Sequence, residues 1–225
     1  MGKNKRKFCF IICVNNEQYF DECQMYIQRL KVPDGYTVEI LPIRGAKCMA
    51  AGYNYGMTLT DAKYKIYMHQ DVFIINTNFL NDILTVFKQN WKIGMIGMVG
   101  SPSLPSDAIM WHGARVGNLY ALDSQNVDFN GYEYCKEDGM TEVEAVDGLM
   151  MVTKEDILWR EDLFDGWDFY DISQCFEFRK KGFRIVVPEQ KKPWCIHEDG
   201  VLNLWYYDKY RQIFKEEYLG KNYFY

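Results

Sequence analysis

The sequence predicts an α/β fold with a mostly parallel central sheet flanked by helices. The continuous apolar run at 8–14 is typical of a strand buried on both faces, as parallel strands are. From this run to about residue 100, short apolar segments alternate with amphipathic segments of helical spacing, in the order β-α-β-α-β-α-β. The hydrophobic fraction of 48% and the 225 residues are enough for one domain with a substantial core.

The first half is expected to form a doubly wound sheet with right-handed crossovers. Asn15 or Asn16 can cap its first helix, and the Pro33-Asp34-Gly35 segment ends that helix region. The predicted elements, in order, are a strand at 8–14, a helix at 19–30, a strand at 36–43, a helix at 46–59, a strand ending at His69, further strand-like residues at 72–75, a helix over 80–87 capped by Asn78, and a strand at 93–99.

The pattern changes after Gly100, where residues rich in Pro, Ser and Gly predict a loop. No linker or internal repeat divides the chain, so we expect a single domain over 1–225 with a first half at 8–100, a second half at 101–200 and a C-terminal helical segment at 201–225. The predicted later elements are a loop at 101–113, an irregular β-hairpin-like segment at 114–134, a strand at 142–152, a helix at 168–181 ended by Gly182, a strand at 183–187 and a helix at 201–219.

Charge and cysteine usage exclude several classes of protein. A net charge of −5 argues against a nucleic-acid binder, which would carry a basic field. The seven cysteines are scattered and form no Cys-x-x-Cys, which indicates a reducing compartment without a disulfide framework or a zinc finger. The run at 8–14 is too short for a signal peptide, so we expect a cytoplasmic protein. A solvated tail is favoured for the basic residues 1–7; a peripheral contact with anionic lipid at the inner face of the membrane is the alternative.

The tripeptide His69-Gln70-Asp71 is the most informative motif, because it ends a predicted strand at the carboxyl edge of the sheet. Open α/β folds bind ligands at that edge. A histidine and an aspartate two positions apart in an extended segment suggest a site for a divalent cation and its phosphate ligand. The alternative is a buried strand that ends in a polar turn.

Three later clusters also lie at the ends of predicted elements. Asp147 precedes Gly148 and an apolar run, Asp168 and Asp171 open a predicted helix, and His197 lies in a late loop. For Asp168 an ordinary helix-capping role is the preferred interpretation. Asp171 lies one turn further into the helix, where capping is less expected.

Taken together, the order of these motifs resembles the GT-A glycosyltransferase fold, a Rossmann-like fold of nucleotide-diphospho-sugar transferases. The resemblance is to the bacterial glycosyltransferase-like group related to glycosyltransferase family 2, and it spans residues 8–197. The segments that carry it are 10–14 with Asn16, 51–56, 64–71, 146–148, Phe164-Asp165, 169–171, 181–183 and 195–197. It implies a nucleotide-binding first half and an acceptor-binding and catalytic second half.

The resemblance implies a role for each motif. Asp71 stands at the last position of the family's Asp-x-Asp, where it would bind Mn²⁺ or Mg²⁺ on the donor diphosphate, and His197 would complete the metal shell. Asp171 matches the base of inverting members, and Asp147 would lie near the sugar or the acceptor. The residues implied in donor binding are Asn16, Asn54, His69, Gln70 and Asp71.

The implied activity is the inverting, metal-assisted transfer of a sugar, with a UDP-sugar as the expected donor and a glycan or a lipid-linked hydroxyl as the acceptor. Surface polysaccharide or glycoconjugate synthesis is the implied pathway. An acceptor wall is expected from Trp111, His112, Trp167 and Asp168; for the first two, packing is the alternative.

Two departures from the family pattern bear on this function. His69 replaces the first aspartate of Asp-x-Asp, and imidazole is a poorer ligand for Mg²⁺ than for Mn²⁺. The second strand ends at Arg44, where relatives often place an aspartate that reads the base. A non-catalytic relative that binds nucleotide or glycan is therefore the main alternative. A nicotinamide enzyme is disfavoured because the turn at 14–17 lacks Gly-x-Gly-x-x-Gly, and the chain has no His-Glu-x-x-His for a zinc hydrolase.

Overall fold

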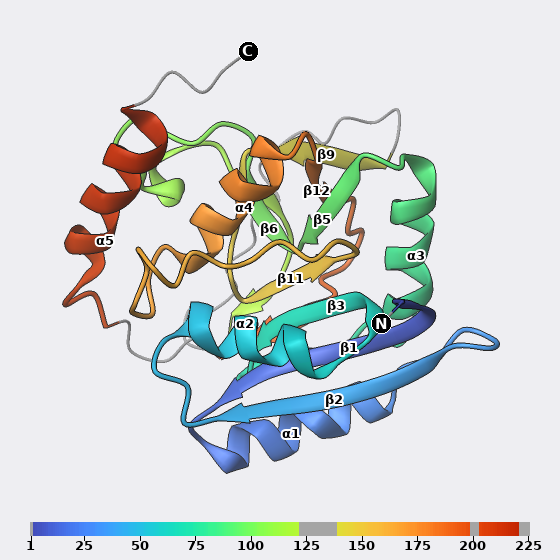
Figure 1. Cartoon of the computed structure of the whole chain (residues 1–225). Coiled ribbons are helices and arrows are strands. Elements are labelled where there is room, and N and C mark those ends of the chain that lie inside the picture. Colours follow the sequence, from blue (N-terminus) through green and yellow to red (C-terminus); the bar gives the residue numbers. More distant parts are fainter. Residues whose placement is uncertain (1, 122–138, 199–202, 221–225) are drawn as a thin grey trace.

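A seven-stranded mixed sheet runs through the centre of the molecule, as the computed structural model in Figure 1 shows. The structure describes residues 2–121, 139–198 and 203–220. The strands of this sheet are β1 (Asn4–Val14), β2 (Thr37–Arg44), β3 (Ala62–His69), β5 (Ile93–Gly97), β9 (Met140–Val143), β11 (Met150–Thr153) and β12 (Arg184–Pro188). Their order is β2-β1-β3-β11-β5-β12-β9, in which only β11 and β9 run antiparallel to their neighbours. The predicted mostly parallel sheet is confirmed.

Helices cover both faces of this sheet (Figure 1). They are α1 (Glu17–Gln28), α2 (Met49–Leu59), α3 (Phe79–Gln89), α4 (Tyr170–Lys180) and α5 (Tyr207–Phe214), with a 3₁₀ turn η1 (Met110–His112) and a π turn η2 (Lys215–Leu219). Alternate residues of β1 face opposite sides. Phe8 and Phe10 join one core with α1 and α3, whereas Cys9 and Ile11 join a second core with α2, α4 and α5.

Two small three-stranded sheets extend the central one. The first contains β10 (Ala145–Val146), β6 (Val99–Ser101) and β7 (Val116–Gly117), and the second contains β4 (Val72–Ile74), β13 (Cys195–His197) and β8 (Tyr120–Ala121). In the second sheet, β13 runs antiparallel to β4 and aligns His197 with Val72. The backbone N–H of Glu198 donates to the carbonyl of Asp71 at 3.0 Å. This pairing brings a late segment of the chain next to the end of β3.

Three predicted strand regions were wrong in detail. The strand expected at 93–99 is β5 and β6, which belong to different sheets, and a Cβ at Gly97 would lie 2.4 Å from the Val146 side chain. The strand expected at 142–152 is divided among β9, β10 and β11. A turn at Asp147-Gly148 separates the last two. The hairpin expected at 114–134 is absent from its described part, because β7 and β8 pair with other strands; residues 122–138 lie outside the described residues.

The helix ends follow local backbone chemistry. Asn16 caps α1 as predicted, since its side chain accepts the N–H groups of Gln18 and Tyr19. Asn78 occupies the N-cap position of α3 but caps no backbone N–H, and its side chain instead donates to Asp82. The predicted cap at Asn78 was therefore wrong.

The other helices begin later than predicted. Helix α2 starts after Cys48, whose sulfur accepts the N–H of Ala51, and α4 starts after Phe169, whose φ of +60° is not helical. The last helix starts at Tyr207, and residues 201 and 202 of the predicted helix lie outside the described residues. Among the described residues, no helix has the length and apolar character that crossing a bilayer requires.

Candidate active site

The carboxyl ends of three parallel strands meet at one edge of the sheet. Strands β1, β2 and β3 end at Val14, Arg44 and His69. Strand β11 runs the opposite way, so the chain enters it at this same edge, and the N–H of His69 donates to the carbonyl of Leu149 at 3.0 Å. The turn at Asp147-Gly148, which directly precedes β11, therefore lies beside the end of β3.

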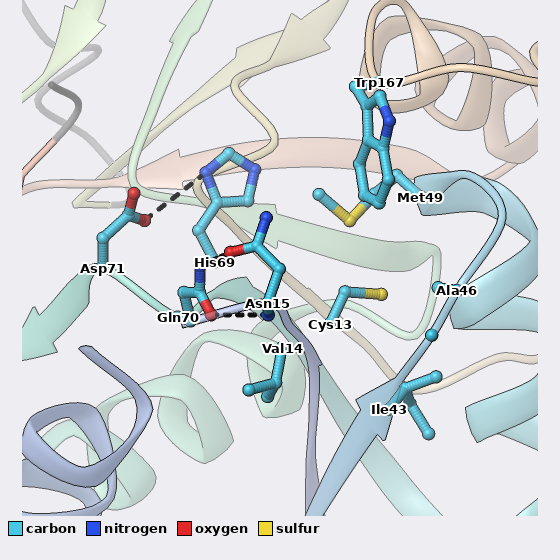
Figure 2. Close-up of a pocket in the computed structure, with 11 residues that line it drawn as sticks. Cys13, Val14, Asn15, Ile43, Ala46, Met49, His69, Gln70, Asp71 and Trp167 are labelled. Atoms are coloured by element: carbon cyan, nitrogen blue, oxygen red, sulfur yellow. Dashed lines mark hydrogen bonds and ion pairs between the residues drawn. The ribbon is translucent and has the colours of Figure 1, made fainter. Parts of the chain in front are cut away.

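A cavity of about 230 Å³ opens at this edge (Figure 2). In Figure 2, Trp167 and Met49 lie on the side opposite Asp71. The residues that line the cavity are Cys13, Val14, Asn15, Ile43, Gly45, Ala46, Met49, His69, Gln70, Asp71 and Trp167. The cavity thus combines backbone and apolar groups from the ends of β1 and β2 with three polar side chains: that of His69, which ends β3, and those of Gln70 and Asp71, which follow it.

Gln70 joins the end of β3 to the turn that follows β1. Its Oε1 accepts the N–H groups of Asn15 and Asn16 at 3.0 and 2.9 Å, and its Nε2 donates to the side chain of Asn15. The Asn16 side chain is occupied by the cap of α1. Of these two predicted donor-binding residues, Gln70 lines the cavity, whereas Asn16 does not.

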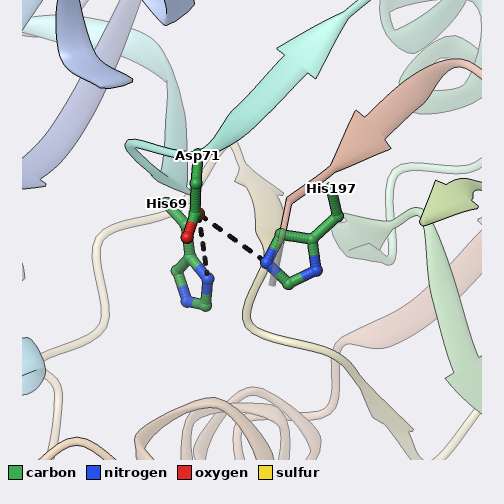
Figure 3. A group of neighbouring side chains, drawn as sticks. All are labelled: His69, Asp71 and His197. Atoms are coloured by element: carbon green, nitrogen blue, oxygen red, sulfur yellow. Dashed lines mark ion pairs between the residues drawn. The ribbon is translucent and has the colours of Figure 1, made fainter. Parts of the chain in front are cut away.

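His69, Asp71 and His197 form a cluster that can hold a metal ion (Figure 3). Asp71 Oδ1 lies 3.9 Å from His69 Nδ1 and 3.7 Å from His197 Nε2, and one ligand atom from each residue lies within 4.8 Å of the others. These separations are longer than hydrogen bonds, which leaves room for a small cation among the three atoms. The structure brings together the two predicted metal ligands, Asp71 and His197, and adds His69.

The surroundings of His69 keep its ring neutral. Burial, reinforced by the neighbouring His197, lowers the pKa of His69 to about 4, while the Asp147 carboxylate opposes this shift. The Nε2 atom of His69 hydrogen-bonds to the hydroxyl of Tyr170. A neutral imidazole has a lone pair available for a metal ion at physiological pH.

Asp171 is a partly buried acid whose pKa is affected by a second carboxylate. Burial and then the charge of Asp147 raise the pKa of Asp171 to about 7, although its oxygens accept the N–H groups of Gly148 and Ile172 at 3.0 and 2.8 Å. Asp147 itself accepts the N–H of Leu149 at 2.8 Å. A carboxyl group with a pKa near neutrality can exchange protons at physiological pH, which is the property of a general acid or base.

Of the predicted site residues, His69, Gln70, Asp71 and Trp167 line the cavity. Asp147, Asp171 and His197 lie outside its lining, at the same edge of the sheet, and Asn16 is the cap of α1. The other four lie outside it as well. The Asn54 amide is bonded at both ends to the backbone of Trp159, at 3.0 and 2.9 Å. Trp111 and His112 belong to the η1 turn, where the His112 ring lies 2.7 Å from Asp107. Asp168 is partly buried, and this burial raises its pKa. Of the predicted acceptor residues, only Trp167 lines the cavity.

Sequence reasoning missed Tyr170 and the reason for Gly148. A Cβ at Gly148 would lie 2.1 Å from the Tyr170 hydroxyl, so only glycine leaves room for that ring against the Asp147-Gly148 turn. A glycine after an isolated aspartate was the available signal. Its partner, a tyrosine in a helix, could not be selected among the 17 tyrosines of the chain.

The fold is that of the GT-A glycosyltransferases, as two solved structures show. Staphylococcus aureus TarS 1-349 in complex with UDP matches with a TM-score of 0.58 at 12% identity, over 96% of this chain and 66% of that chain. The mannosyltransferase PcManGT from Pyrobaculum calidifontis, in complex with GDP-Man and Mn²⁺, matches with a TM-score of 0.60 at 11% identity, over 94% and 64%. This chain therefore spans about two thirds of either length.

The chain belongs to the Glycosyltransferase like family, whose profile matches residues 9–218. This match confirms the predicted family. No curated protein sequence matches the chain.

Proposed function

We propose that the protein transfers a sugar from a nucleoside-diphosphate sugar to an acceptor hydroxyl, with inversion and with the help of a divalent cation. One observation carries this proposal: the cluster of His69, Asp71 and His197 and the carboxyl group of Asp171, whose pKa is raised to about 7, lie at the same edge of the sheet. TarS with UDP and PcManGT with GDP-Man and Mn²⁺ support a nucleotide sugar as the donor class.

The donor side of the site consists of the cavity and the metal-binding cluster. Two imidazole nitrogens and a carboxylate oxygen are a suitable donor set for a divalent transition-metal ion, so the residues of the cluster fit such a cation. Asp71 and His197, together with His69, would hold it. A bound cation would supply positive charge to the departing diphosphate. The chain's own contribution is to place the polar residues after β3 beside the apolar wall from β1 and β2.

The acceptor side is assigned to Asp171. In the proposed step the acceptor oxygen bonds to the anomeric carbon, the bond from that carbon to the diphosphate oxygen breaks, and the acceptor proton moves to an Asp171 oxygen. A base with a pKa of about 7 is both substantially ionised and basic enough at neutral pH. The charge of Asp147 helps to raise this pKa, and Asp147 lies two residues before Leu149, whose carbonyl accepts the N–H of His69.

The remaining assignments follow from the family and the cavity. We propose that the acceptor contacts Trp167, which lines the cavity and is 51% exposed, because a free aromatic face suits a sugar ring. A UDP-sugar donor, a glycan or lipid-linked acceptor and a role in surface polysaccharide or glycoconjugate synthesis stay predictions. The cytoplasmic location also stays a prediction, supported by the free thiols of the six cysteines that the structure describes.

A binding screen followed by a turnover assay tests this function. We expect one of UDP, GDP, CDP or dTDP to raise the melting temperature in the presence of Mn²⁺. With the matching nucleotide sugar, release of the nucleoside diphosphate should fall about 10²–10⁴-fold in Asp171→Asn, as for loss of a general base. The matched control is Asp165→Asn, because Asp165 is exposed and bonded to Tyr210.

Binding without turnover in the wild type would favour the alternative, a non-catalytic nucleotide- or glycan-binding relative. Equal turnover in Asp171→Asn and the wild type would contradict the assignment of the base.

A further inference from the structure

The two ring nitrogens of His69 face different partners. Nε2 hydrogen-bonds to the hydroxyl of Tyr170, and Nδ1 lies 3.9 Å from Asp71 Oδ1 on the side of the ring that faces the metal-binding cluster (Figure 3). Metal-binding histidines show this arrangement, with one nitrogen on the metal and the other in a hydrogen bond that fixes the tautomer. If Nε2 carries the proton and donates it to the hydroxyl, the lone pair of Nδ1 points toward Asp71.

Tyr170 is held firmly enough to fix that ring. It is the first residue of α4 and is 4% exposed. Its ring packs against Gly148, which has no Cβ and so leaves room for it. Its ring also lies 6.0 Å from the ring of Tyr53 and 6.1 Å from that of Trp159.

The donor set of the cluster discriminates among cations. Mg²⁺ prefers oxygen ligands and retains its water, whereas first-row transition metals accept imidazole nitrogen. Two of the three side chains in the cluster are histidines. Of these, His69 belongs to the His-x-Asp motif at the end of β3 and lines the cavity. In an Asp-x-Asp motif a carboxylate would stand at this position, in place of the His69 Nδ1 that lies 3.9 Å from Asp71 Oδ1.

We propose that this site selects a transition-metal dication over Mg²⁺, that His69 Nδ1 makes the selection, and that Tyr170 is the positioning residue that presents it. This inference deepens the proposed function, on which it rests for the use of the cation. The juxtaposition of Tyr170, His69, Asp71 and His197 is a property of this chain's own residues.

Metal titrations of the full chain, without nucleotide, test the selection. Metal-free protein is titrated with Mg²⁺, Mn²⁺ and Co²⁺ by calorimetry, and Co²⁺ is also followed by its visible absorption, which reports nitrogen ligands. We expect Mn²⁺ to bind at least about 10-fold more tightly than Mg²⁺, and Co²⁺ more tightly than Mn²⁺. His69→Asp should reduce the difference in affinity between Mn²⁺ and Mg²⁺ and change the visible absorption spectrum of bound Co²⁺.

A second pair of variants tests the positioning role. Tyr170→Phe keeps the buried ring and removes only the hydroxyl, so we expect it to fold and to bind Mn²⁺ about 10–100-fold more weakly. The matched control is Tyr218→Phe, because Tyr218 is equally buried and donates its hydroxyl to Glu177, away from the cluster. That variant should bind Mn²⁺ as the wild type does.

Three results would overturn the inference: equal affinities for Mg²⁺ and Mn²⁺, an unchanged preference in His69→Asp, or no binding of any of the three cations. Undiminished Mn²⁺ affinity in Tyr170→Phe would overturn the positioning role. The melting temperature is also measured with UDP or another nucleoside diphosphate in the presence of a chelator. A shift under these conditions would show that the nucleotide binds without a metal ion. In that case the inference about the metal would fail while nucleotide binding, on which the proposed function depends, would stand.

Discussion

The pH dependence of turnover should follow the ionisation of Asp171. Because burial and the Asp147 charge raise its pKa to about 7, the carboxylate form makes up about 9% of the protein at pH 6 and about 91% at pH 8. If Asp171 is the base, kcat/KM rises about tenfold across this interval. His69, with a pKa of about 4, is already neutral there and contributes no step.

The variant Asp147→Asn tests the physical cause of this profile. It removes a charge that raises the pKa of Asp171 but leaves the burial of Asp171, which is the larger cause. The midpoint of the acidic limb should therefore move to lower pH without reaching the usual carboxyl range, and the ratio of rates at pH 8 and pH 6 should fall below tenfold.

The assay is the initial rate of nucleoside-diphosphate release between pH 5.5 and 8.5, with Mn²⁺ saturating at every pH. The control is Asp165→Asn, because Asp165 is exposed and is not one of the main causes of the raised pKa of Asp171. A wild-type midpoint near pH 4, or the same midpoint in Asp147→Asn as in the wild type, would refute the reasoning.

Three further predictions concern stability. Gly148→Ala places a Cβ 2.1 Å from the Tyr170 hydroxyl, so it should lower the free energy of unfolding by about 1–3 kcal/mol in urea titrations and weaken Mn²⁺ binding; an unchanged midpoint would contradict that close contact. Gln70→Ala removes the acceptor of two backbone N–H groups and should lower the free energy of unfolding by about 1 kcal/mol in the same assay. An unchanged free energy of unfolding would show that Gln70 does not stabilise the contact between the end of β3 and the turn after β1. Because the pKa of Asp171 is raised, the folded state binds more protons than the unfolded chain between about pH 4 and pH 7. The free energy of unfolding should therefore fall as pH rises through that window, by up to about 4 kcal/mol from Asp171. Asp171→Asn should reduce this fall when unfolding is compared at pH 5 and pH 8, and an equal fall would show that the carboxyl titrates normally.

Local sequence was sufficient for the first half of the fold. The apolar run of β1, the helix stripe after Asn16 and the strand that ends at His69 are each encoded within about a dozen residues. Each was found near its predicted place, although β1 begins earlier, at Asn4, and α1 spans Glu17–Gln28. The second half departs from prediction where short strands change sheets. The apolar residues around Asp147 belong to two strands, and only their different partners, β6 for β10 and β3 for β11, reveal the turn between them.

The candidate site was likewise predictable only where its residues are marked by local sequence. Asp71 was recognisable from its place after a strand, but its approach to His197 depends on the antiparallel pairing of β13 with β4, which joins segments more than a hundred residues apart. Asn54 shows the converse. Its motif suggested the donor site, yet its amide is bonded to the backbone of Trp159, a long-range contact that the motif does not encode.

The position of β11 has a consequence for how the protein is synthesised. Strand β11 lies between β3 and β5, and both neighbours of β5 in the sheet, β11 and β12, come later in the chain. A ribosome that adds about 5–20 residues per second needs about 3–10 seconds to proceed from β5 to β11. During that interval the nascent chain carries an open edge on β3 and an unpaired β5, which can pair with other chains. We therefore expect the emerging polypeptide to depend on chaperones until residue 153 has left the ribosome, and a fragment ending near residue 100 to aggregate.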